Sequence, residues 1–239
     1  MIIVRVMGGL GNQLQQYALY KKLESVGKDV RLDTFWFRNE SFQAGMAAKR
    51  ELELGSVEGI RYLEACEEEI RSLLGRLWEE KEGLGEKIKR RFLPSAYPVL
   101  IENDMYYEKL TSFTDKYLVG YWACEKYYAD VLDVLRQEIG FPKCKDDALQ
   151  KKNEKAIERM EESVSVSVHI RRGDYLDDVN RALFGNICKE TYYESAIAYI
   201  RERFPAAKFY LFSDDIPYVR ERYQGEEYEV IDWNKQENG

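Results

Sequence analysis

The chain has 239 residues, which is enough for one large domain or two small ones. Its composition, 45% hydrophobic and 33% charged, is that of a globular protein and excludes collagen-like, low-complexity and wholly disordered chains. Thirty-six basic against 43 acidic residues give a net charge of −7. This balance argues against non-specific nucleic-acid binding, because that binding needs a basic surface.

The sequence shows no signal that would direct the protein into or across a membrane. The first residues lack the charged leader and long apolar run of a signal peptide, and no run of 18 apolar residues occurs. We therefore expect no transmembrane segment and a cytoplasmic protein, with peripheral association with the inner membrane face left open. The four cysteines form no C-x-x-C pair and the chain has one histidine, so we expect neither a zinc site nor a redox motif.

The first half of the chain alternates short β-branched runs with longer helical ones. This rhythm predicts an α/β fold with mostly parallel sheets. The expected elements, in chain order, are a strand at 2–7, a helix at 12–26, a strand at 29–34, charged surface helices between about 49 and 92, a strand at 116–120 and a helix at 124–139.

The second half repeats the rhythm after a predicted linker from Gly140 to about residue 152. We expect two nucleotide-fold domains, 1–142 and 153–239, with ligands at the carboxyl ends of their strands. The strand at 163–170 alternates cleanly, so its valines and Ile170 share one face. The remaining expected elements are a helix at 190–204, a strand at 207–212, a helix at 216–224 and a strand at 228–231.

The first candidate motif is the glycine turn Gly8–Gln13, between the first strand and the first helix. Glycines let the backbone turn tightly and approach a ligand, and free N–H groups at a helix N-terminus bind anions. Gly9 and Gly11 match part of the dinucleotide fingerprint, and Asp33 lies where a ribose-binding acid would sit. A NAD-type site is one interpretation; a turn that serves only helix–strand packing is the other.

The second motif, HIRRGDY at 169–175, ends the strand at 163–170. On a strand, His169 and Arg171 point to one side and the apolar residues to the other. Arg171 and Arg172 concentrate positive charge in an acidic protein, and guanidinium groups suit phosphate oxygens through paired hydrogen bonds. An exposed pair that bridges surface acids is the alternative, which the position at a strand end disfavours.

The third motif is Ser213-Asp214-Asp215, directly after the strand at 207–212. Its carboxylates could ligate a divalent metal on a nucleotide diphosphate, or accept the N–H groups of a guanine edge. Alternatively, the motif caps the helix that starts at Ile216. Capping and binding are compatible.

Six blocks of sequence occur along the chain in a fixed order: GGLGNQ, VRLDTF, GYWACEKYY, VHIRRGDY, YYESAIAYI and KFYLFSDD. In these blocks the chain resembles the bacterial α-1,2-fucosyltransferases of glycosyltransferase family 11, over essentially its whole length. It departs from the family at Gln15, where a bulky apolar residue is usual. Family members also continue beyond the Asp232-Trp233-Asn234 stretch. We therefore expect a C-terminally truncated chain that binds GDP weakly, transfers little or no fucose and self-associates as a homo-oligomer.

The resemblance implies a GT-B-type pair of Rossmann-like domains, the C-terminal one incomplete, with the acceptor on the first and the donor on the second. It implies a galactoside α-1,2-fucosyltransferase: an inverting transfer of L-fucose from GDP-fucose to the 2-hydroxyl of a terminal galactoside on an oligosaccharide acceptor. No metal or other cofactor is expected, because Arg171 and Arg172 would stabilise the charge on the departing GDP.

The resemblance also implies roles for individual residues. Arg171 is assigned to the diphosphate and Arg172 to positioning or phosphate contact. His169 is assigned to the nucleotide, and one acid of the third motif to guanine. The expected donor-binding residues are Gly9, Gly11, Asn12, His169, Arg171, Arg172, Ser213, Asp214 and Asp215.

The general base is assigned to Asp174, the carboxylate that follows the arginine pair most closely in the sequence. Asp174 could equally orient one of the arginines. Three other functions stay open at this stage: a NAD-dependent oxidoreductase, a catalytically weak truncated relative that only binds, and another GDP-sugar transferase.

Overall fold

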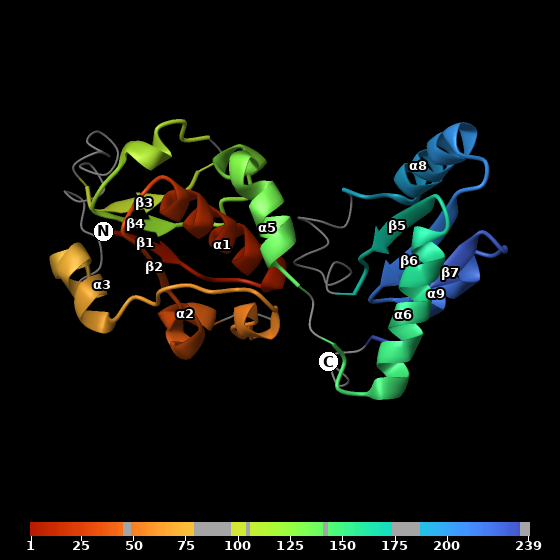
Figure 1. Ribbon diagram of the computed structural model, residues 1–239, viewed down its shortest axis with the longest axis horizontal. Helices are drawn as coiled ribbons and strands as arrows, with labels where there is room; N and C mark the ends of the chain where they lie inside the picture. The colour runs from red at the N-terminus through yellow and green to blue at the C-terminus, as the bar shows by residue number, and fades with distance from the viewer. Residues whose placement is uncertain (45–48, 79–96, 104–105, 141–142, 174–186, 235–239) are drawn as a thin grey trace. The chain divides into compact units, whose positions relative to one another are not determined.

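A computed structural model of the protein describes residues 1–44, 49–78, 97–103, 106–140, 143–173 and 187–234 (Figure 1). The chain divides into two compact units, Met1–Pro142 and Lys143–Gly239. Each unit has its own parallel sheet and its own hydrophobic core. The predicted α/β class with parallel sheets is therefore confirmed, whereas GT-B pairing and an incomplete second domain stay predictions.

The sheet of the first unit has the strand order β2-β1-β4-β3, and every neighbouring pair is parallel. Its strands are apolar on both faces, as expected when helices cover both sides. The strands are β1 (Ile2–Arg5), β2 (Val30–Asp33), β3 (Val99–Ile101) and β4 (Lys116–Val119).

Helices cover both faces of this sheet. Helix α1 (Leu10–Ser25) packs its buried residues on one face, in the same core as part of α5 (Leu132–Glu138). Helix α3 (Glu67–Leu74) packs on the other face through Ile70, and the short α2 (Phe35–Arg38) follows β2.

The helix predicted at 124–139 is wrong in its first half. Two 3₁₀ turns, Glu125–Tyr127 and Ala129–Val131, precede α5. Tyr127 and Tyr128 are both buried in the core, and Tyr128, between the two turns, has a non-helical backbone with a φ of −141° and a ψ of 16°. Burying these adjacent rings outweighs the continuous helix that the sequence pattern favours.

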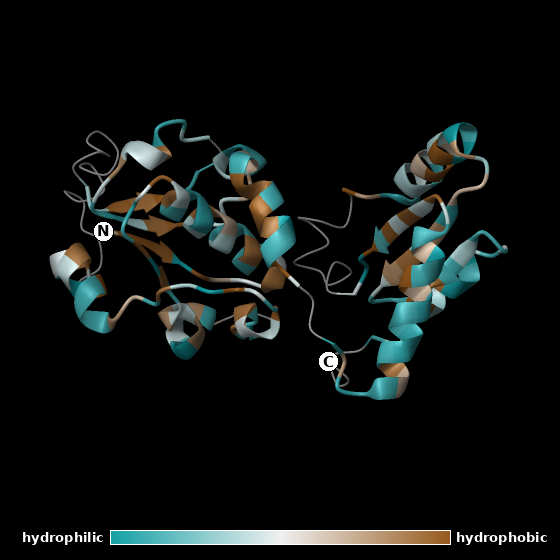
Figure 2. Ribbon diagram, viewed as in Figure 1, coloured by the Kyte–Doolittle hydropathy of each residue, from teal (hydrophilic) through white to brown (hydrophobic). Residues whose placement is uncertain are grey.

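The described residues of the second unit form three parallel strands in the order β5-β6-β7. Helices α8 (Glu190–Arg203) and α9 (Ile216–Arg222) contribute to the core on one face, and α6 (Asp147–Glu161) to the core on the other. Figure 2 shows hydrophobic colours along β5 and β6, whereas α6 is mostly in hydrophilic ones. The strands are β5 (Ser165–Ile170), β6 (Lys208–Ser213) and β7 (Tyr228–Val230).

Helix α6 begins inside the stretch predicted as a linker. The side chain of Asp146 accepts hydrogen bonds from the backbone N–H groups of Ala148 at 2.8 Å and Leu149 at 3.1 Å. This N-cap starts the helix in a polar stretch whose composition alone indicates a loop. Within the described residues, no helix is long and apolar enough to cross a membrane.

Candidate functional site

The second and third motifs meet at the carboxyl ends of β5 and β6. These strands pair in register, with Ile170 beside Ser213. The hydroxyl of Ser213 donates to the carbonyl oxygen of Ile170 at 2.6 Å and accepts from the backbone N–H of Asp215 at 2.9 Å. Ser213 thus ties the two strand ends together, and residues 171–173 follow as a segment that we term the arginine loop.

Asp214 holds the backbone of the arginine loop. Its two carboxylate oxygens accept from the N–H groups of Arg172 at 2.8 Å and Gly173 at 3.1 Å. A Cβ atom on Gly173 would lie 2.8 Å from one of these oxygens, so glycine permits the close approach. The carboxylate therefore fixes the conformation of the loop through two charge-assisted hydrogen bonds.

The side chain of Arg172 is held from two sides. Its Nε donates to Asp215 at 3.0 Å, and its guanidinium carbon lies 3.7 Å from the centroid of the Tyr218 ring. Tyr218 in turn donates its hydroxyl to Glu190 at 3.0 Å; burial and this carboxylate raise the pKa of Tyr218. Arg172 is therefore a fixed cation, about one-third exposed.

Asp215 also caps α9, since its other oxygen accepts from the backbone N–H of Tyr218 at 3.2 Å. The capping interpretation of the third motif is thus confirmed for Asp215. Both acids already accept hydrogen bonds within the protein, and their roles toward guanine or a metal stay untested. Among the described residues, no three His, Cys, Asp or Glu side chains come together as a metal site.

His169 and Arg171 are exposed at the end of β5, whose apolar residues face the core as predicted. The carbonyl oxygen of His169 accepts from the Tyr193 hydroxyl at 3.2 Å, which ties this strand end to α8. Asp174, the predicted general base, lies outside the described residues.

In the first unit, the glycine turn joins β1 to α1. The residue that needs glycine for its conformation is Gly8, with a φ of +83°, and a Cβ there would lie 2.6 Å from Asn12 Nδ2. Within the described part of the chain, a Cβ on Gly9 or Gly11 would meet no atom within 4 Å. The open space beside these two glycines suits the approach of a ligand.

Two fully buried glutamines of α1 fasten this turn to its surroundings. Gln13 donates to the carbonyl oxygens of Gly8 at 2.9 Å and Glu51 at 2.8 Å. Gln16 accepts from the backbone N–H of Met7 at 3.0 Å and donates to the carbonyl oxygen of Gly120 at 2.8 Å. The turn is therefore rigid before any ligand arrives.

A carboxylate occupies the N-terminus of α1. Glu53 Oε2 accepts from the backbone N–H of Leu10 at 3.1 Å. This negative charge stabilises the positive end of the helix dipole, and it disfavours a phosphate at the same N–H group. The sequence motif alone could not show it, because Glu53 lies more than 40 residues further along the chain.

Asp33, the candidate ribose-binding acid, is 2% exposed. One oxygen accepts from the backbone N–H of Phe35 at 2.8 Å, and the Tyr117 hydroxyl donates to the other. Burial and the charge of Asp33 raise the pKa of Tyr117. With its carboxylate buried and bonded in this way, Asp33 is poorly placed to bind a ribose, and the NAD interpretation loses its main support.

Sequence reasoning missed several residues that shape these sites. Gln13, Gln16, Glu53 and Tyr218 all act through contacts that link distant segments. The sequence signal that could have found them is the pair of glutamines that follows the glycine turn. If these side chains are buried they need hydrogen-bond partners, since an unpaired buried amide destabilises a fold by about 1–3 kcal/mol.

Fold and motifs together define an α/β protein whose polar motifs stand at the ends of parallel strands. Residues 84–234 match the family described as Glycosyl transferase family 11. The α-1,2-colitosyltransferase of Escherichia coli is 30% identical over 226 residues, which span 94% of this chain and 72% of that protein. The chain belongs to glycosyl transferase family 11, as the sequence blocks predict.

Two further similarities were found. The O-antigen biosynthesis glycosyltransferase WbnK of E. coli is 26% identical over 234 residues, which span 90% of this chain and 73% of that protein. The crystal structure of NodZ α-1,6-fucosyltransferase soaked with GDP-fucose superposes with a TM-score of 0.47 at 11% identity, covering 98% of this chain and 78% of that one.

Proposed function

We propose that this glycosyltransferase moves L-fucose from GDP-fucose to the 2-hydroxyl of a terminal galactoside, with inversion and without a metal. The observation that carries the proposal is the fixed arginine loop at the ends of β5 and β6. Its backbone is held by Asp214, and the side chain of Arg172 is held by Asp215 and Tyr218.

A fixed cation is what this chemistry requires. When the bond between fucose C1 and the β-phosphate oxygen breaks, negative charge builds up on the departing GDP. Because Arg172 is already oriented, stabilising that charge needs no reorganisation of its side chain. Arg171, exposed beside it, is assigned to direct contact with the diphosphate, and His169 to the nucleotide.

The glycine turn of the first unit fits the sugar better than the phosphates. Glu53 places a carboxylate at the N-terminus of α1, which repels a phosphate but accepts hydrogen bonds from hydroxyl groups. We therefore assign Gly9, Gly11 and Asn12 to the border of the fucosyl group.

The donor sugar has one specific rival. The E. coli relative is named for colitose, which is fucose without its 3-hydroxyl. A site that hydrogen-bonds this hydroxyl rejects the analogue that lacks it, whereas an apolar site discriminates far less. Comparing GDP-fucose with GDP-colitose as donors therefore separates the two assignments.

Transfer is tested with GDP-fucose and a β-galactoside, with product linkage read by NMR. We expect α-1,2 product that EDTA does not reduce. Arg171→Ala should lower kcat/KM at least 30-fold, because charge-assisted contacts to a leaving group contribute about 2–4 kcal/mol. Arg171→Lys should rescue little, since an ammonium group cannot make a bidentate contact.

The matched control is Arg203→Ala, which removes an exposed arginine at the end of α8 that is assigned no role. Strict dependence on Mg²⁺ or Mn²⁺ would overturn the metal-independent mechanism. GDP binding with no transfer to any galactoside or to water would favour the binding-only alternative. The general base, assigned to Asp174, needs its own test: Asp174→Asn should abolish transfer and leave GDP affinity unchanged.

A further inference from the structure

The first unit contains a cavity of about 420 Å³ at the carboxyl end of β2. Ligands of parallel α/β sheets bind at this edge. The glycine turn begins at the same edge of the sheet, at the end of the neighbouring strand β1. Arg5 at the end of β1 pairs with Asp33, and the N–H of Val6 donates to the Asp33 carbonyl oxygen at 2.8 Å. We term this cavity the β2 pocket; its chemistry comes from Asp33, Phe35, Arg38, Glu64, Glu67 and Trp78.

A larger cavity of about 700 Å³ in the same unit is a weaker candidate. It is lined by Met1, Asp115 and Lys116, so it lies at the amino ends of β1 and β4. This edge is opposite to the one where the glycine turn of this unit stands. The β2 pocket is therefore the cavity that lies at the same edge of the sheet as the glycine turn.

Two half-buried aromatic rings line the β2 pocket. The centroids of Phe35 and Trp78 lie 5.8 Å apart with their planes tilted by 45°. Aromatic walls with a few placed polar groups are typical of small-molecule sites. A pyranose has the matching surface: one face of C–H groups that packs on a ring, and an edge of hydroxyl groups that seeks polar partners.

The polar groups of the pocket suit a neutral, hydroxyl-rich ligand. Asp33 is buried, while Glu64 and Glu67 supply two further carboxylates. Among the described residues that line the pocket, the arginine is Arg38, which donates to Glu64 at 2.6 Å and to Thr34 at 3.1 Å. The acidic surroundings repel a nucleoside diphosphate and accept hydrogen bonds from sugar hydroxyls.

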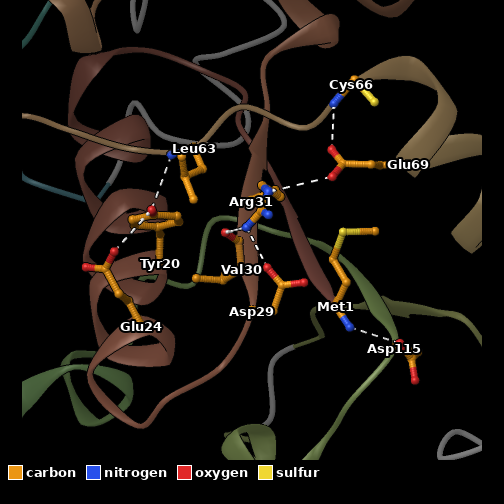
Figure 3. A network of polar contacts seen from close by, with 10 residues as sticks. All are labelled: Met1, Tyr20, Glu24, Asp29, Val30, Arg31, Leu63, Cys66, Glu69 and Asp115. Atoms are coloured by element: carbon orange, nitrogen blue, oxygen red, sulfur yellow. Dashed lines mark hydrogen bonds and ion pairs between the residues drawn. The ribbon is translucent and has the colours of Figure 1, made fainter.

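The wall that carries Glu64 is fixed before binding. Its backbone pairs with β2, since Leu32 N–H donates to Leu63 O at 2.9 Å and Ala65 N–H donates to Leu32 O at 2.8 Å. Figure 3 shows the neighbouring anchors: Leu63 N–H donates to Tyr20, and Glu69 accepts from Cys66 N–H and faces Arg31. A preorganised wall reduces the entropy lost when a ligand binds.

We propose that the β2 pocket binds the terminal galactoside of the acceptor, with a ring of the sugar against Trp78 and its hydroxyl groups on Glu64. This assignment rests on the proposed transferase function, because it names the site for the second substrate of that reaction. It is a separate claim about the first unit, and it can fail while donor binding at the arginine loop holds.

The test combines binding and kinetics in the whole chain. Saturation-transfer NMR with lactose as the probe reports acceptor binding without any donor. Steady-state transfer then gives the acceptor KM at saturating GDP-fucose, and GDP-fucose hydrolysis reports the donor site alone. The variants are Trp78→Ala and Glu64→Gln; their matched controls in the same unit are Tyr106→Ala, 42% exposed, and the exposed Glu125→Gln.

We expect both pocket variants to lose the lactose signal and to raise the acceptor KM at least tenfold. The KM for GDP-fucose and the hydrolysis rate should stay within twofold of the parent, as should all parameters of the controls. Trp78 packs against a core cluster, so Trp78→Ala could lose lactose binding by misfolding. Glu64→Gln changes a half-exposed side chain, and a loss of binding in this variant is not explained by misfolding.

An unchanged lactose signal and acceptor KM in both variants would overturn the assignment, as would equal effects in the controls. If the parent neither binds GDP nor hydrolyses GDP-fucose, the transferase proposal fails instead. The lactose signal still decides the pocket in that case: its loss on Trp78→Ala and Glu64→Gln supports a galactoside site, and its persistence refutes one.

Discussion

Asp214→Asn distinguishes two roles for the first acid of the third motif. If Asp214 reads guanine, the substitution weakens GDP and leaves pyrophosphate binding unchanged. If it holds the arginine loop, as its bonds to Arg172 and Gly173 indicate, it weakens every ligand of the diphosphate site equally. We expect the second result.

The magnitude follows from the two hydrogen bonds. A hydrogen bond to a charged group contributes about 1.5–3 kcal/mol when shielded, and less at an exposed side chain such as Asp214. Asparagine keeps one acceptor oxygen and turns an N–H group toward the other donor. A net loosening of about 1–2 kcal/mol corresponds to a 5- to 30-fold loss of affinity.

Isothermal titration of GDP, ADP and pyrophosphate into the parent and Asp214→Asn measures this directly. The matched control is Asp147→Asn, an exposed acid in the first turn of α6. A loss confined to GDP, with pyrophosphate affinity retained, would refute the loop-holding role and restore the guanine assignment.

Three further outcomes are expected. Gly8→Ala should lower the urea-unfolding free energy by about 1–2 kcal/mol, because alanine at a φ of +83° is strained, whereas Gly9→Ala, at a φ of −80° with open space around it, should not. Gln16→Leu should lower the urea-unfolding free energy by about 2–4 kcal/mol, because it leaves Met7 N–H and the Gly120 carbonyl unpaired. Gln15→Leu should be neutral or stabilising, because in the described structure Gln15 Oε1 is buried without a partner. Burial raises the pKa of Tyr223 to about 12. The stability that this neutral side chain contributes is therefore complete below pH 10 and is lost as the pH rises toward 12. Tyr223→Phe should flatten the decline of the urea-unfolding free energy over this range.

The local pattern of apolar and polar residues predicted elements that bury one face. Strand β5 shows this, since its alternation of valines with serines and a histidine predicts which side faces the core, and the observed burial follows it. The motifs at strand ends were also found, because His169, Arg171 and Asp214 stand where parallel sheets present ligands. The resemblance to the family then indicated that these motifs serve one activity, glycosyl transfer.

The elements that were mispredicted depend on contacts between distant residues. The break before α5 follows from burying Tyr127 and Tyr128, and the early start of α6 follows from one N-cap, Asp146. Neither appears as a change in hydrophobic period. The β2 pocket escaped prediction for the same reason, because Phe35, Glu64 and Trp78 come from three separated segments.

Charge decides which unit should take which substrate. The acids next to the arginine loop already accept hydrogen bonds from that loop, so their negative charge is offset by the cation that they position. In the first unit, Glu53 stands at the one helix N-terminus that the motif offers to a phosphate, and carboxylates line the β2 pocket. We therefore expect an anionic donor at the second unit and a neutral glycan at the first. Removing the charge tests this argument: Glu53→Gln should strengthen pyrophosphate binding at the glycine turn, measured in an Arg171→Ala background where the arginine loop no longer dominates. A pyrophosphate affinity unchanged by Glu53→Gln would show that this carboxylate does not set the preference.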